Sequence, residues 1–174
     1  MELNPNNIEA YSNLINLLQI QRRYSEAEEF GRKLVKLFPE SSQYKLILSV
    51  ILFKLGKDVE FINLLNYIIE TEKIDYKVVG KAYFSLGIYH FDKKNLNEAE
   101  SLLKKALTYN PKDFVILFFL MEINLVSNNI KEVQDIYNNI LTLFKKDFKY
   151  TDAAQITKTL KLNLSTEYLL NLAK

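Results

Sequence analysis

The chain has 174 residues and a net charge of +2, and it contains only 4 glycines and 3 prolines, where average usage would give about twenty of the two together. Because sheet folds place glycine and proline at most of their tight turns, this scarcity strongly disfavours a β-sandwich or barrel and indicates one all-helical domain. With no cysteine and a single histidine, the chain lacks the ligands for zinc–thiolate and multi-histidine sites, so we expect no metal and no cofactor. The balanced charge gives no indication of binding to nucleic acid or to an anionic membrane.

In chain order, apolar segments with helical spacing alternate with short polar breaks. The breaks lie at residues 21–23, 56–58, 93–95 and 127–129. The two segments that flank each break predict a hairpin of two antiparallel helices. Four units are predicted in this way, over residues 8–41, 42–79, 80–113 and 114–147.

The four units share one register. Leu14, Leu48, Leu86 and Leu120 are separated by 34, 38 and 34 residues, and three further apolar positions keep the same spacing. Because a helix hairpin leaves an apolar face that only the next hairpin can cover, this repetition predicts a right-handed α-solenoid. The longer second spacing places four additional residues near 71–78, as a longer helix or as a longer loop.

The two ends of the chain depart from the repeat. Residues 1–7 match the end of the third unit in register, which favours a segment of a longer array; the alternative is a native start with Asn4 or Asn7 capping the first helix. Residues 148–174 predict two further helices, over 150–164 and from Ser165 to Leu172, that cap the last open face. The whole of 1–174 is thus predicted to be a single array.

The third unit has the most specific pattern: an aromatic residue and a Leu–Gly pair on its first helix, a small residue early in its second helix, and a proline at its end. These residues are Tyr83, Leu86, Gly87, Ala99 and Pro111. In them the chain resembles the tetratricopeptide repeat (TPR) family. The first unit keeps part of the pattern, whereas the second and fourth keep little beyond the apolar register, and bulky Phe61 stands where the family has a small alanine.

The resemblance implies that the first helix of each hairpin lines a concave groove that holds a peptide or helix of a partner protein. By register, the predicted groove residues are Asn13, Asn16, Leu46, Val50, Phe53, Lys81, Phe84, Ile88, Phe91, Phe118, Phe119 and Glu122. Their character changes along the chain, from polar amides in the first unit to apolar and aromatic residues in the last three. Phe84, Phe91, Phe118 and Phe119 are the expected anchors, because aromatic residues dominate binding hot spots.

Some family members bind carboxylates with a clamp of lysine, asparagine and arginine residues. Here Asn16 and Lys81 occupy two of the clamp's places, but Ser12, Ile47 and Ser85 occupy others and cannot pair with a carboxylate. An apolar peptide or amphipathic helix is therefore the expected ligand. The alternative occupants of the apolar part of the groove are the chain's own C-terminal segment or a second copy of the chain, which would make a homodimer.

No pattern indicates an enzyme. His90 is expected to be a partly buried packing residue, because a general base needs an orienting partner and a substrate pocket, and the sequence lacks glycine-rich phosphate loops and nucleophile elbows. The longest apolar run, from Phe114 to Val126, contains Glu122 and is shorter than the roughly 20 residues of a membrane span. We therefore predict a cytoplasmic, non-catalytic scaffold for protein binding; the alternative is a regulatory or targeting region of a larger protein such as a glycosyltransferase or signalling enzyme.

Overall fold

The structure is a computed structural model, and it describes residues 8–147. Within that range the chain forms eight α-helices and no strand, so the predicted all-α fold is confirmed. The predictions for residues 1–7 and for a cap over 148–174 lie outside the described residues. The helices are α1 (Ile8–Ile20), α2 (Tyr24–Leu37), α3 (Ser42–Lys54), α4 (Asp58–Thr71), α5 (Tyr76–Asp92), α6 (Leu96–Tyr109), α7 (Phe114–Val126) and α8 (Ile130–Asp147).

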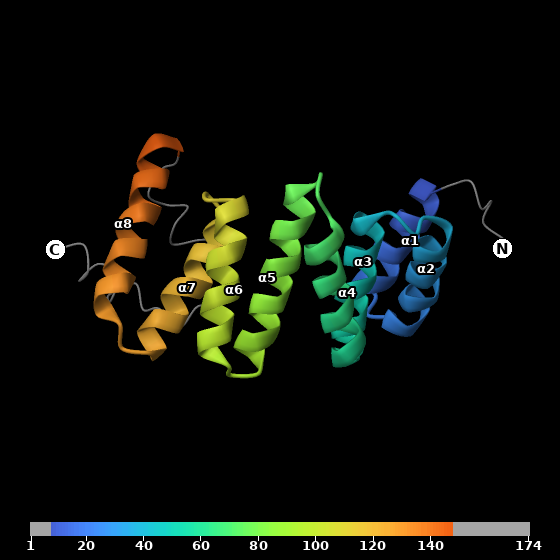
Figure 1. Cartoon of the computed structure of the whole chain (residues 1–174), viewed down its shortest axis with the longest axis horizontal. Helices are drawn as coiled ribbons and strands as arrows, with labels where there is room; N and C mark the ends of the chain where they lie inside the picture. Colours follow the sequence, from blue (N-terminus) through green and yellow to red (C-terminus); the bar gives the residue numbers. More distant parts are fainter. Residues whose placement is uncertain (1–7, 148–174) are drawn as a thin grey trace.

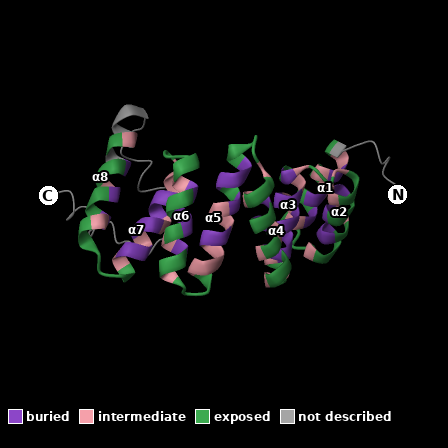
Figure 2. Ribbon diagram, viewed as in Figure 1, coloured by how far each residue is buried: buried purple, intermediate pink, exposed green. Residues whose placement is uncertain are grey.

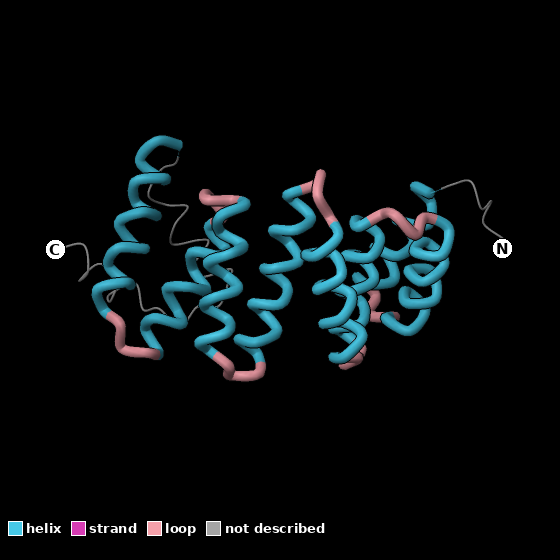
Figure 3. Tube along the Cα trace, viewed as in Figure 1, coloured by secondary structure: helices cyan, strands magenta, loops and turns pink. Residues whose placement is uncertain are grey.

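The four hairpins follow one another in chain order along the long axis of the molecule (Figure 1). Short turns join the two helices of each hairpin near one edge of the row, and the loops between hairpins lie at the other edge (Figure 3). Neighbouring helices therefore run antiparallel, as in a helical-hairpin solenoid.

Local sequence signals start and stop these helices. The first helices of the second, third and fourth hairpins begin after a side-chain cap: Ser41 Oγ accepts from the Tyr44 N–H at 3.4 Å, and Asp75 and Asp113 cap α5 and α7 in the same way. Such caps satisfy backbone donors that have no partner inside the helix. The hairpin turns instead contain one residue with positive φ at equivalent positions: Arg22, Gly56, Lys94 and Asn128.

Three buried apolar clusters hold the row together. The first is built from α1, α2 and α3, around Ile15 and Ile51; the second lies mainly among α3, α4 and α5, around Phe61; the third joins α6, α7 and α8, around Leu103. Buried residues run along every helix and alternate with exposed ones (Figure 2). Each cluster takes residues from more than one hairpin, so no hairpin has a core of its own and each depends on its neighbour.

The four additional residues of the third unit form helix rather than loop. Helix α5 has 17 residues where α1, α3 and α7 each have 13. The extra turn begins after the Asp75 cap and lies against the end of α6, where the rings of Tyr76 and Tyr109 stack with centroids 6.5 Å apart and those of Tyr83 and Tyr109 at 5.9 Å. Two alternatives were predicted for this joint, a longer helix and a longer loop, and the longer helix is the one that forms.

Candidate partner-binding surface

Three of the predicted anchors meet across two hairpins. The Phe91 and Phe119 rings contact edge to face with centroids 5.3 Å apart, and the Phe84 and Phe119 rings lie 6.3 Å apart. All three side chains are partly exposed, and we call them the aromatic cluster. Ile88 and Leu125, from the same two helices, are also partly exposed. This region of α5 and α7 therefore offers aromatic and aliphatic side chains that the third core cluster only partly covers.

Two predicted groove residues have no free surface. Leu46 is 6% exposed and Phe118 is 3% exposed, and each belongs to a core cluster. The prediction of Phe118 as a surface anchor therefore needs correction. Helix α7 is apolar on almost every side, and a helix of that kind is surrounded by other elements; Phe118 packs with Leu117 and Met121 into the third cluster.

The predicted groove residues outside the aromatic cluster differ in their surroundings. Asn13, Asn16 and Lys81 are exposed, and Val50 is 37% exposed. Phe53 instead contacts the second core cluster, with its ring centroid 5.3 Å from that of Phe61. The polar first unit is thus separated from the aromatic cluster by a helix, α3, whose Phe53 side chain packs against the core.

Glu122 places a carboxyl group beside the aromatic cluster. Its side chain is partly buried, and this burial raises the pKa of the carboxyl above 4.5, while the charge of Lys94 acts in the opposite direction. An ionised carboxylate in apolar surroundings lacks solvation. A hydrogen-bond donor or a cation brought by a ligand would therefore stabilise its charged form.

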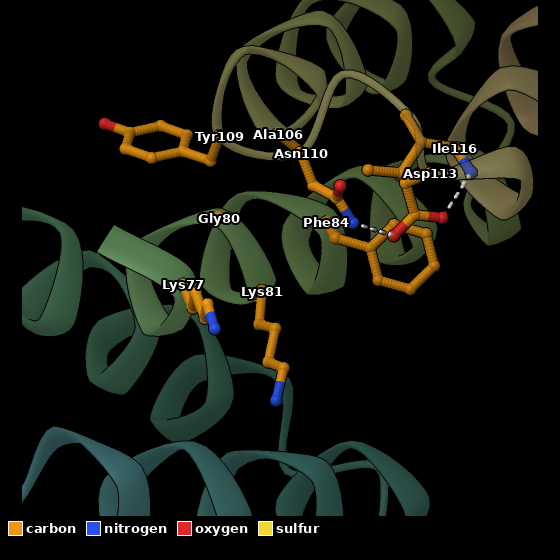
Figure 4. Close-up of a pocket in the computed structure, with 9 residues that line it drawn as sticks. All are labelled: Lys77, Gly80, Lys81, Phe84, Ala106, Tyr109, Asn110, Asp113 and Ile116. Atoms are coloured by element: carbon orange, nitrogen blue, oxygen red, sulfur yellow. Dashed lines mark hydrogen bonds between the residues drawn. The ribbon is translucent and has the colours of Figure 1, made fainter. Parts of the chain in front are cut away.

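A hollow of about 260 Å³ lies between the first half of α5 and the corner that joins α6 to α7 (Figure 4). Its lining residues are Lys77, Gly80, Lys81, Phe84, Ala106, Tyr109, Asn110, Asp113 and Ile116. Of these, only Lys81 and Phe84 are among the predicted groove residues. Of the remainder, the four-residue insertion gave a signal for Lys77, which belongs to the extra turn of α5.

Residues 80–113 match the family model described as "Tetratricopeptide repeat". This range contains the Leu86–Gly87 pair and Ala99, and the solved structures with the same architecture include proteins described as having TPR-like repeats. Residues 80–113 thus match a tetratricopeptide repeat, and the eight described helices share the fold of TPR-repeat structures.

Solved structures resemble this chain over most of its length. A crystal structure of MamA gives a TM-score of 0.66 at 19% identity, covering 82% of this chain and 81% of that one. A putative kinesin light chain with TPR-like repeats from Podosopora anserina gives 0.69 at 12% identity, covering 98% and 95%. At these identities the likeness shows a shared fold alone.

A human relative shares sequence with part of this chain. It is the protein O-mannosyl-transferase TMTC3, 27% identical over 116 residues, which are 66% of this chain. The match covers only 12% of the length of that relative. The likeness is therefore to one stretch of a much longer protein.

The single histidine of the chain lies against its neighbours. His90 is partly buried, its ring meets that of Tyr89 edge to face at 5.2 Å, and its Nδ1 lies 3.4 Å from Asn95 Nδ2. Over residues 8–147 no group of three or more His, Cys, Asp or Glu side chains is placed to hold a metal ion. Likewise, no helix in that part of the chain is both long and apolar enough to cross a membrane.

Proposed function

We propose that the protein is a non-catalytic scaffold that binds an apolar peptide or an amphipathic helix of a partner protein on the face formed by its first helices. The observation that carries the proposal is the aromatic cluster of Phe84, Phe91 and Phe119, in which rings from two hairpins meet while staying partly exposed. Partly exposed aromatic groups next to one another are typical of interaction sites. An amphipathic helix offers a complementary apolar face.

The chemistry of the face supports a ligand that is mostly apolar. Ile88 and Leu125, on the two helices of the aromatic cluster, and Val50, on α3, are further apolar side chains with exposed surface. Glu122 supplies one hydrogen-bond acceptor beside the cluster. A cation or hydrogen-bond donor on the ligand that reaches Glu122 would fix the register of binding. Polar groups placed in this way contribute more to specificity than to affinity.

The experiment is co-purification of partners from an extract of the source cells with wild-type protein and with Phe91→Ser/Phe119→Ser. Loss of an anchoring aromatic typically weakens binding by about 2 kcal/mol, or roughly thirtyfold, so the double variant should retain almost none of the specific partner. The matched control is Val59→Ser, which removes an apolar side chain that is 73% exposed on α4. Equal capture by all three proteins would contradict the proposal.

Folding of the variants is checked by circular dichroism and thermal unfolding. Because Phe91 and Phe119 are packed against the third core cluster, some loss of stability is expected. The conservative pair Phe91→Leu/Phe119→Leu separates the two effects, since leucine keeps an apolar contact without the ring. At a temperature where all variants are folded, Phe91→Leu/Phe119→Leu should therefore capture more of the partner than Phe91→Ser/Phe119→Ser does.

A second candidate function is a regulatory or targeting region of a larger enzyme. The match to the O-mannosyl-transferase TMTC3, confined to 12% of that protein, favours it. The complete reading frame tests it directly: a catalytic region in the same polypeptide would favour this candidate, and its absence would favour the independent scaffold. A cytoplasmic location and a homodimer stay predictions, to be tested by cell fractionation and by sedimentation.

A further inference from the structure

We infer that the hollow between α5 and the α6–α7 corner receives one apolar side chain of the bound peptide, while an acidic residue next to it in that peptide pairs with Lys77 and Lys81. This inference rests on the proposed function and states the chemistry of the partner. The hollow, at about 260 Å³, is smaller than the roughly 300–1,000 Å³ of typical small-molecule sites. Its size suits a single side chain better than a cofactor.

The walls of the hollow are apolar and held in place. Its lining includes Gly80 and Ala106, and a Cβ atom at Gly80 would lie 2.7 Å from Tyr109 Cβ. The Tyr109 ring stacks with the rings of both Tyr76 and Tyr83. Since this wall is fixed before a ligand arrives, binding needs little ordering of the protein.

The rim carries positive charge without a carboxylate partner. Within the described residues Lys57, Lys93 and Lys104 each form an ion pair, whereas the ammonium groups of Lys77 and Lys81 form none. Figure 4 shows these two lysines side by side, across the hollow from Asn110 and Asp113, with their ammonium groups directed away from its apolar residues. A carboxylate that pairs with them would therefore lie at the rim, outside the apolar interior.

The one acid that lines the hollow already has partners. Asp113 Oδ1 accepts from the N–H groups of Val115 and Ile116 at 3.0 and 3.3 Å, and its Oδ2 accepts from Asn110 Nδ2 at 3.1 Å. These donors, at the start of α7, stabilise its negative charge. Asp113 therefore leaves the two lysines available to an acidic ligand.

The site depends on a feature particular to the third unit. Lys77 belongs to the additional turn at the start of α5, which the second and fourth hairpins lack. The turn also brings Tyr76 to the stack that fixes Tyr109. The insertion thus supplies one of the two cations and part of the support for one wall.

The test is a ¹H–¹⁵N NMR titration of the whole chain with two blocked dipeptides, acetyl-Leu-Glu-amide and acetyl-Leu-Gln-amide. We expect saturable shifts of the Lys77, Gly80, Lys81 and Tyr109 amides, with the Glu dipeptide binding about three- to tenfold more tightly than the Gln dipeptide. The preference should disappear in Lys77→Gln/Lys81→Gln and weaken at high salt. Both substitutions replace exposed side chains, so the variant is expected to fold.

Two outcomes would overturn the inference: no shift of these amides with either dipeptide, or equal shifts with both. Neither dipeptide depends on the natural partner or on Phe91 and Phe119. If the titration gives either of these outcomes while partner capture still depends on the aromatic cluster, the inference about the hollow is wrong and the proposed function is unaffected. If partner capture does not depend on Phe91 and Phe119 while the Glu dipeptide is still preferred, the proposed function is wrong and the inference about the hollow stands.

Discussion

At the scale of single residues, Gly87 permits the close contact between α5 and α6. A Cβ atom at this position would lie 2.8 Å from Leu103 Cγ and 2.9 Å from Leu103 Cδ2. Leu103 is fully buried at 0% exposure, so it has no room to move away. The absence of a side chain at Gly87 is therefore a packing requirement of the third hairpin.

Gly87→Ala should destabilise the protein by about 1–2 kcal/mol, because the cost of overpacking exceeds the gain of up to about 1 kcal/mol in helix propensity. Gly31→Ala is the matched control, since its Cβ would meet only the ends of side chains, Leu48 Cδ1 at 3.2 Å and Ile51 Cδ1 at 3.4 Å. We expect the control to be neutral or stabilising. Urea unfolding of both variants measures the difference, and equal effects would contradict this role for Gly87.

The hairpin turns show a second constraint on single residues. Gly56 adopts a φ of 69° at the same position where Arg22 adopts 59°. Left-handed backbone costs a side-chain-bearing residue about 1 kcal/mol or more, and glycine avoids that cost. Arg22→Gly should therefore raise the free energy of unfolding by up to about 1 kcal/mol, and Gly56→Ala should lower it by a similar amount. Opposite signs in thermal unfolding are the expected result; a loss of stability in both would show that the Arg22 side chain matters more than its backbone.

At the scale of the elements, ion pairs connect successive hairpins. Glu28 on α2 binds Lys57 at 2.7 Å and Arg32 at 2.7 Å, and Arg32 also binds Glu60 at 2.6 Å. At the next junction Asp58 binds Lys93 at 2.9 Å. The Glu28 side chain is only 12% exposed. Loss of its charge, at the junction of the first and second hairpins, should therefore lower the free energy of unfolding more than loss of a charge at the next junction.

Lys57, and after it Arg32, lower the pKa of Glu28 below its ordinary value of 4.5 by donating hydrogen bonds to the carboxylate. Because the folded pKa is lower than the unfolded one, the stabilisation is complete above about pH 4.5 and is lost as the pH falls through the folded value. Glu28→Gln should therefore lower the unfolding free energy by about 1 kcal/mol at neutral pH and make it decline less on acidification. The control is Glu29→Gln, an exposed neighbour. An unchanged acid profile in Glu28→Gln would contradict the role of this ion pair.

At the scale of the whole molecule, the periodic leucines were sufficient to predict the fold. Leu14 and its equivalents predicted helix hairpins that cover one another, and all eight described helices follow that pattern. The insertion in the third unit was ambiguous, because the sequence of residues 72–79 fits a loop and a helix equally well. In the structure Asp75 caps α5, which begins at Tyr76.

The candidate site was harder to predict than the fold. Helix α7 has few polar residues to mark an outer face, so its sequence could not separate buried Phe118 from partly exposed Phe119. The hollow depends on the contact of Gly80 with Tyr109, two residues 29 apart in the sequence, and on the stacking of Tyr76, from the extra turn, on Tyr109. Register within a repeat gives no information on contacts that only an insertion creates.

The central claim is that a partner binds on the face of α5 and α7 that carries Phe84, Phe91 and Phe119. Hydrogen–deuterium exchange of the protein with and without its co-purified partner tests the claim most directly, because covered and rigidified segments exchange more slowly. We expect slower exchange in peptides spanning α5 and α7, and no such slowing when the partner is added to Phe91→Ser/Phe119→Ser. Slower exchange confined to α2, α4 and α6 would contradict it.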